Sequence, residues 1–160
     1  MRRGIFAALV AASALSSSLS AAAPGAEAPT PHFVSLRAEA ANGRRGPSLQ
    51  SRIDWIYQRE SLPLEVIGVN GQWRRVRDPD GVETWMFAQD LDERRTAYFK
   101  TQAALLREPH RSSAATAYIA AGVVGGLTAC QGAWRRVAVG SHVGWVDKSA
   151  LWGADTCAGV

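Results

Sequence analysis

The sequence contains few of the residues that build metal and nucleophilic centres. Its three histidines, His32, His110 and His142, are far apart, and none has a metal-ligand spacing to another or to the two cysteines. Serines cluster near the N-terminus and at Ser112 and Ser113, with no base at a recognisable spacing. We therefore expect no metal site, no cofactor and no catalytic residue, and a protein that is not an enzyme.

A sustained helical period and a long apolar run are also missing. The apolar residues 4–15 follow Arg2 and Arg3, and the run is too short to span a bilayer. A basic start, a short apolar run and small residues are typical of an export signal, so we predict a signal peptide at residues 1–22. Residues 23–32, rich in Pro and Ala, are predicted to be a disordered leader. The exported protein would be periplasmic or extracellular, without a transmembrane segment.

A strong excess of positive charge is absent once this signal is removed. The full sequence has 18 basic and 14 acidic residues, a net charge of +4. Cleavage after residue 22 takes away Arg2 and Arg3 and no acidic residue, which leaves 16 − 14 = +2. So small a charge does not predict a nucleic-acid partner.

Only two cysteines are present, Cys130 and Cys157. In an oxidising compartment an even count favours a disulfide, which would tie the C-terminal tail, residues 154–160, to the preceding unit. Two independent thiols, buried or free, are the alternative.

An internal repeat organises the rest of the chain. Residues 57–77 align without gaps on residues 118–138, and further positions match on both sides. The matched pairs are Tyr57 with Tyr118, Trp73-Arg74-Arg75-Val76 with Trp134-Arg135-Arg136-Val137, Trp85 with Trp145, Leu91 with Leu151, and Arg44 with Arg107. We therefore predict two small units, residues 33–100 and 101–153.

Short apolar runs broken by turn residues predict that both units are all-β. The expected strands are 62–69, 72–77 and 82–87 in the first unit and 122–130, 133–139 and 143–146 in the second. Asn70-Gly71 is a strong hairpin signal, and Asp78 to Gly81 reads as a turn, so Asp78 and Asp80 are interpreted as turn formers rather than catalytic carboxylates. One turn of 3-10 helix is expected before Leu91 and Leu151. Residues 96–100 and those around Trp152 would close the two units.

These residues resemble the tandem bacterial SH3-like proteins of the exported type. The first copy carries the motifs that support the resemblance: Ser35-Leu36-Arg37-Ala38, Asn42-Gly43-Arg44-Arg45-Gly46-Pro47-Ser48, and Trp55-Ile56-Tyr57 followed by residues 62–67. The second copy departs from them, because residues 105–109 keep the Arg and the Pro and lack the Asn and the Gly. The resemblance implies two tandem small SH3-like β-barrels without catalytic activity. It implies partners in the cell envelope, either a peptidoglycan stem peptide or an envelope protein.

Aromatic and basic side chains are the candidates for binding. Flat rings suit an extended peptide, although repeated Trp residues in a small barrel also suit core packing. We expect Trp73 and Trp134 in the core and Trp55 and Tyr57 near an exposed loop. One Arg of each Arg-Arg pair could bind an anionic wall polymer or carboxylate, or both could be a solvated strand edge. The predicted binding residues are Arg44, Arg45, Trp55, Tyr57, Arg75 and Trp85.

Three functions remain open on this basis. The favoured one is a non-enzymatic binding module of the cell envelope. The second is a structural or assembly protein that pairs with another chain through a sheet edge, which predicts Trp85, Trp145 and Trp152 at a surface between barrels or subunits. The third, least favoured, is an accessory to cell-wall hydrolysis.

Overall fold

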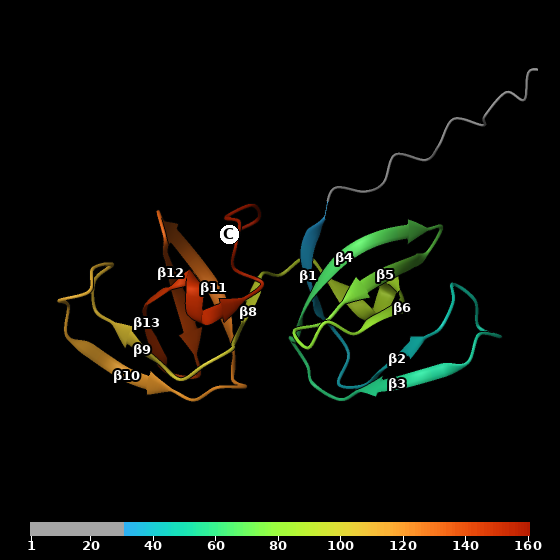
Figure 1. Cartoon of the computed structure of the whole chain (residues 1–160), viewed down its shortest axis with the longest axis horizontal. Helices are drawn as coiled ribbons and strands as arrows, with labels where there is room; N and C mark the ends of the chain where they lie inside the picture. The colour runs from blue at the N-terminus through green and yellow to red at the C-terminus, as the bar shows by residue number, and fades with distance from the viewer. Residues whose placement is uncertain (1–30) are drawn as a thin grey trace, which may run out of the picture.

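The structure is a computed structural model that describes residues 31–160, so the predicted signal peptide and most of the predicted leader lie outside the described residues. Within that range the chain is all-β apart from two 3-10 helices, which confirms the predicted fold class. It forms two seven-stranded antiparallel sheets, one after the other along the chain (Figure 1). No helix of residues 31–160 is long and apolar enough to cross a membrane.

The two sheets repeat one topology. In the first domain, residues 32–92, the strand order is β3-β2-β6-β5-β4-β1-β7. Its elements are β1 (His32–Leu36), β2 (Ala41–Arg44), β3 (Ile53–Tyr57), β4 (Pro63–Asn70), β5 (Trp73–Arg77), β6 (Glu83–Phe87), η1 (Ala88–Asp90) and β7 (Leu91–Asp92). In the second domain, residues 96–152, the order is β10-β9-β13-β12-β11-β8-β14, the same sequence of positions. Its elements are β8 (Thr96–Phe99), β9 (Ala103–Leu106), β10 (Ala115–Ile119), β11 (Val124–Gln131), β12 (Trp134–Val139), β13 (His142–Asp147), η2 (Lys148–Ala150) and β14 (Leu151–Trp152).

The sheets divide earlier along the chain than expected. The expectation that residues 96–100 close the first domain is wrong, because β8 pairs with β11 and β14 in the second sheet. The first sheet closes instead where β7 pairs with β1. The division therefore falls between Asp92 and Thr96, before the expected boundary at residues 100 and 101. At the other end, β1 begins at His32, which places that residue in the first domain and not in the leader.

The central hairpin of each domain turns at a glycine. Asn70 lies opposite Trp73, so the loop is Gly71-Gln72 and not the expected Asn70-Gly71. Gly71 has a φ of +55°, and Gly132, at the same place in the second domain, has the same value. Because only glycine adopts positive φ readily, it fixes the first loop position in both hairpins.

The other predicted turns are confirmed. Asp78 shapes the turn between β5 and β6, since its Oδ1 accepts hydrogen bonds from the backbone N–H groups of Asp80 (3.0 Å) and Val82 (2.9 Å). The 3-10 helices η1 and η2 follow β6 and β13 as expected. Leu91 and Leu151, directly after them, are buried in the two cores.

The cores consist mainly of aliphatic side chains, with Phe99 in the second, and the expectation of core tryptophans is wrong. Fully buried examples are Leu36, Leu64, Val76 and Met86 in the first domain and Leu105 and Val137 in the second. Trp73 and Trp134 are only partly buried. The reason is strand alternation: Val76 points inward on β5, so Trp73, an odd number of residues away, points outward.

Strand register corrects the match of Tyr57 with Tyr118. Ala41 lies opposite Tyr57, and the equivalent Ala103 lies opposite Ile119. Tyr57 therefore corresponds to Ile119, which is buried, whereas Tyr118 is 72% exposed. The gapless alignment hides this shift because the connection after β3, residues 58–62, is one residue longer than the connection after β10.

The match of Arg44 with Arg107 is also wrong. Arg44 lies opposite Trp85, and Leu106 lies opposite Trp145, the partner of Trp85 in the repeat. Arg44 therefore corresponds to Leu106, and the second domain has no guanidinium at this place.

The two domains contact each other through rings and aliphatic groups. Tyr98 and Val124 of the second domain pack against the first core. Phe33 and Trp152 meet edge to face, with ring centroids 5.5 Å apart. Of the tryptophans expected at such a surface, Trp152 lies at the contact between the domains.

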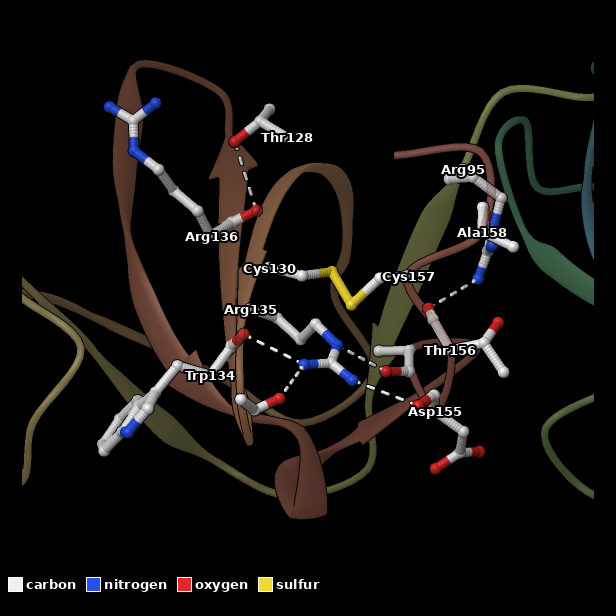
Figure 2. The surroundings of a disulfide bond; sticks show 12 residues. Arg95, Thr128, Cys130, Trp134, Arg135, Arg136, Asp155, Thr156, Cys157 and Ala158 are labelled. Atoms are coloured by element: carbon white, nitrogen blue, oxygen red, sulfur yellow. Dashed lines mark hydrogen bonds between the residues drawn. A yellow bond between two sulfur atoms is a disulfide. The ribbon is translucent and has the colours of Figure 1, made fainter.

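A disulfide fixes the C-terminal tail to the second domain (Figure 2). Cys130 on β11 is bonded to Cys157, with their Cα atoms 6.0 Å apart, which confirms the predicted pairing and removes the free-thiol alternative. The buried Arg95 donates hydrogen bonds to the carbonyls of Gly153 (2.9 Å) and Ala158. The tail, although exposed beyond Ala154, is therefore held to the second domain by a covalent bond and by hydrogen bonds.

The first arginine of each Trp-Arg-Arg motif has a structural role. Arg74 Nη1 donates to the carbonyls of Gly71 (2.9 Å) and Trp73 (3.1 Å), and Arg135 makes the same two bonds in its own hairpin. Arg135 also donates to the tail carbonyls of Ala154 (2.6 Å) and Asp155 (3.1 Å), as Figure 2 shows. These bonds explain why the residue type recurs, and they leave the second arginine of each motif to face outward.

Candidate functional site

A groove of about 380 Å³ lies on the outer surface of the first domain. Its walls come from β2 with the segments on either side of it, from the facing ends of β5 and β6, and from η1. The lining residues are Ala40, Ala41, Asn42, Arg44, Leu49, Trp73, Phe87, Gln89 and Asp90. Two rings lie among amide, guanidinium and carboxyl groups, a combination that suits an extended peptide.

Trp73 and Phe87 form the aromatic part of the groove. They lie directly opposite each other on β5 and β6, and their rings meet edge to face with centroids 5.1 Å apart. Each points outward because Val76 and Met86 occupy the inward positions of the same strands. The hairpin thus sets two rings at a fixed place on the surface.

Arg44 shapes the far wall of the groove. Its Nη1 donates to the carbonyls of Leu49 (2.9 Å) and Ser51 (2.8 Å), which holds the loop between β2 and β3. Leu49 remains 68% exposed at the rim. A predicted binding residue therefore lines the groove and also positions an apolar side chain there.

Asp90 supplies a partly buried carboxyl group to the groove. Desolvation raises the pKa of Asp90 above its usual range. The carboxyl group therefore takes up a proton at a less acidic pH than a solvated aspartate does.

Three of the predicted residues lie side by side on this face. Arg44 on β2, Trp85 on β6 and Arg75 on β5 are opposite one another across three neighbouring strands. Gly68 on β4 ends this row, and a Cβ there would lie 3.2 Å from that of Arg75 and 4.0 Å from the Trp85 ring. The tertiary structure thus brings Arg44, Arg75 and Trp85 together, next to the groove.

Acidic neighbours already pair with two of the predicted arginines. Arg75 contacts Glu83 at 2.7 Å, and hydrogen bonds from Arg77, together with the nearby charge of Arg75, hold the pKa of Glu83 below its usual value. Arg45 contacts Asp54 at 3.0 Å, away from the groove. Arg45 is therefore not placed in this site.

Trp55 and Tyr57 lie at a different place. Both belong to β3 and line a second cavity, of about 400 Å³, on the side of the second domain. Trp55 is 54% exposed as expected. Tyr57 is only partly exposed, because it packs against the first core and its hydroxyl donates to the buried Asp78. The predicted set is therefore divided between two surfaces.

The second domain lacks the chemistry of the groove. By strand register, Leu106 replaces Arg44, Ala104 replaces Asn42, and Asp147 replaces Phe87. Asp147 accepts a hydrogen bond from the N–H of Ser149 and so caps η2, whereas Phe87 makes no such bond at η1. The first domain has a ring where its sister domain has a stabilising cap.

The predicted binding residues did not include Phe87, Leu49 or Asp90, which line the groove. The signal for Phe87 was present, because the turn between β5 and β6 places it opposite Trp73. Leu49 and Asp90 could not be found in this way, since their position depends on how the loop and η1 fold over the sheet. Within residues 31–160, no group of His, Cys, Asp and Glu could hold a metal ion.

Residues 37–93 and 100–153 each match the family model of the bacterial SH3 domain. The chain belongs to the bacterial SH3 domain family. The match confirms the predicted resemblance and the reading of the two sheets as tandem SH3-like domains.

Among solved structures, the tandem SH3 chain is similar to NlpC2 from Trichomonas vaginalis, with 16% identity over 77% of this chain and 48% of that one and a TM-score of 0.36. NlpC1 from the same organism matches with 16% identity, 76% and 45% coverage and a TM-score of 0.36. The chain thus spans less than half the length of these proteins. No curated protein matches it.

Proposed function

We propose that the protein is an exported, non-enzymatic binding module whose first SH3 domain takes an extended cell-envelope peptide, such as a peptidoglycan stem peptide, into the groove beside Trp73 and Phe87. Membership of the bacterial SH3 family supports a cell-wall-related binding module. The observation that carries the proposal is the asymmetry of the two domains. They share one topology, yet the aromatic pair and the guanidinium of the groove occur in the first alone.

Asp147 and Phe87 stabilise their domains in different ways. An aspartate that caps a helix contributes about 1 kcal/mol of stability relative to a residue without a side-chain acceptor. Phe87 forgoes that contribution at η1 and keeps an outward-facing ring partly exposed. The edge-to-face contact of Phe87 with Trp73 offsets that loss by a comparable amount, so the two domains differ less in stability than in surface: the first presents a partly exposed ring on which a ligand could stack.

The proposal is tested with a matched pair of variants. Trp73→Leu removes a groove ring, and Trp134→Leu makes the same change at the equivalent place in the second domain. With a soluble stem peptide as the probe, calorimetry should show binding to the natural protein, a loss of about tenfold or more in Trp73→Leu and little change in Trp134→Leu. Equal losses in both variants, or no binding to stem peptide or insoluble peptidoglycan, would refute the groove as the site.

Export and the lack of activity have their own tests. N-terminal sequencing of protein from fractionated cells should find a start near residue 23 in the envelope or medium. Digestion assays with wall material should show no turnover. Turnover that one Ser or Asp substitution abolishes would overturn the non-enzymatic assignment.

A specific feature of β3 supports the assembly role as a second candidate. This strand ends the first sheet, pairing with β2 alone among the described strands, and it exposes Ile53 (41%), Trp55 (54%) and Ile56 (63%). Apolar edge strands of this kind pair readily with another chain. Sedimentation at high concentration should then show self-association or a complex that Ile56→Lys weakens, and a monomer with no crosslinked envelope partner would count against it.

A further inference from the structure

The second cavity lies where the two domains meet and is separate from the groove. It is lined by side chains of β3, of the turn after β5 and of β8: Trp55, Tyr57, Pro79, Asp80, Val82 and Tyr98, together with Arg59, Leu62 and Asp78. None of these residues lines the groove. Because Tyr98 comes from the second domain, the cavity is complete only when both domains are present.

A hydrogen-bonded pair forms the polar wall of this cavity. Tyr57 donates to Asp78 Oδ2 at 3.0 Å, and Asp78 Oδ1 accepts the two backbone N–H groups of its own turn. Asp78 is 7% exposed. Burial of Tyr57 raises the pKa of its hydroxyl well above the usual value, and the neighbouring charge of Asp78 raises it further. The Tyr57 ring is therefore held in one orientation.

The fold does not require this polar pair. In the second domain the equivalent of Tyr57 is Ile119, and the residue five positions after Trp134, where Asp78 stands after Trp73, is Val139. Ile119 is buried in the second core, and Val139 packs against that core. Asp78 Oδ1 serves the turn of the first domain, whereas the bond from Tyr57 to Oδ2 has no counterpart in the second domain and fixes a ring at the cavity wall.

Charge in the cavity favours a cation. The lining contains two carboxylates, of Asp78 and Asp80, and one guanidinium, that of Arg59. Arg59 Nη1 is directed to the carbonyl of Gly122 in the second domain, at 2.7 Å, and so joins the two domains. Asp80 lines the cavity and is exposed to solvent, so its carboxylate lies at the mouth of the cavity.

We infer that this interdomain cavity binds an alkylammonium group, such as the side-chain amine of a lysine-like residue, between the rings of Trp55, Tyr57 and Tyr98 and the carboxylate of Asp80. Aromatic faces attract cations through their quadrupole, and a nearby carboxylate adds a direct ion pair. Leu62, Pro79 and Val82 supply apolar surface for the methylene chain. A cavity of about 400 Å³ has room for such a chain.

The experiment compares two probes that differ in the ammonium group. Nα-acetyl-lysine amide and Nα-acetyl-norleucine amide are titrated into the isotope-labelled natural protein, and the Trp55 indole and Tyr98 backbone signals are followed by NMR. We expect saturable shifts of these signals with the lysine probe and at least about threefold weaker binding of the norleucine probe. Equal binding of both probes, or shifts confined to Trp73 and Phe87, would overturn the inference.

Two variants separate this site from the groove. Asp80→Asn keeps the size of an exposed side chain and should weaken binding of the lysine probe about threefold. Added salt should reduce this difference, because it screens the ion pair that the natural protein makes with the probe. Trp73→Leu, in the groove, should leave the lysine probe unaffected. If Asp80→Asn binds as the natural protein does, the inference fails, and that failure leaves the proposed groove untouched because stem-peptide binding is measured independently.

Discussion

Replacing Arg135 with methionine should destabilise the second domain much more than the same change at Arg74. Arg135 is 2% exposed and donates four hydrogen bonds to backbone carbonyls, whereas Arg74, partly exposed, donates two. The extra pair goes to Ala154, itself buried, and Asp155. Met keeps much of the volume and none of the donors, so Arg135→Met leaves a buried carbonyl without a partner.

The magnitude follows from those two additional bonds. A hydrogen bond from a charged donor contributes about 1.5–3 kcal/mol of stability. The variant also avoids the desolvation cost of burying a guanidinium, which offsets part of the loss. We therefore expect Arg135→Met to lower the free energy of unfolding by about 3 kcal/mol and the Tm by roughly 10 °C. Arg74→Met, whose acceptors lie near water, should cost about 1 kcal/mol.

Thermal unfolding followed by circular dichroism measures both variants, and hydrogen exchange at residues 154–160 reports on the tail. Faster exchange should accompany Arg135→Met while the disulfide stays intact. Equal Tm losses for the two variants would refute the reasoning, as would an Arg135→Met protein as stable as the natural one.

Three further predictions rest on other contacts. Gly125→Ala should lower the free energy of unfolding by about 1–3 kcal/mol, because the added Cβ would lie 2.5 Å from Val137 Cγ1. Gly126→Ala should be tolerated, because its Cβ would have nothing within 4 Å. Equal chemical-denaturation midpoints for the two variants would contradict this. Cys130→Ser should lower stability by about 3 kcal/mol, since the bridge closes a chain separation of 27 residues, and a reducing agent should then lower the Tm of the natural protein and leave that of the variant unchanged. The pKa of Glu83 in the folded protein is below its usual value of 4.5, so its ion pairs contribute to stability above about pH 4.5, and this contribution is lost as the pH falls through the folded-state pKa. Glu83→Gln should therefore lose less stability than the natural protein on acidification. Parallel curves of unfolding free energy against pH for the two proteins would contradict this.

The elements predicted best were those encoded by local chemistry. The turn at Asp78 and the two 3-10 turns follow from residues a few positions apart, and the structure has them where expected. The hairpin loop was displaced by one residue because Gly71, rather than Asn70, takes the positive φ. The Cys130 to Cys157 pair needed only the count of cysteines and the expected compartment.

The candidate site could be predicted only in part. Arg44, Arg75 and Trp85 were all expected to bind, and they do lie together, but the rule that joins them is strand register across β2, β6 and β5. Trp73 was expected in the core, but it lies opposite Phe87 on the outer face and lines the groove. Trp55 and Tyr57 were grouped with these residues by composition, although β3 carries them to another surface.

By itself, the sequence determined that the chain repeats one small all-β unit, because turn residues and alternation act over short distances. The tertiary structure decided which domain carries each site. Tyr57 and Ile119 are recognised as equivalent only once the sheets have formed, because the extra residue in the connection after β3 shifts the linear alignment and leaves the strand pairing unchanged. The cavity between the domains is beyond any local pattern, because it exists only where Tyr98 of β8 meets β3 and the turn after β5.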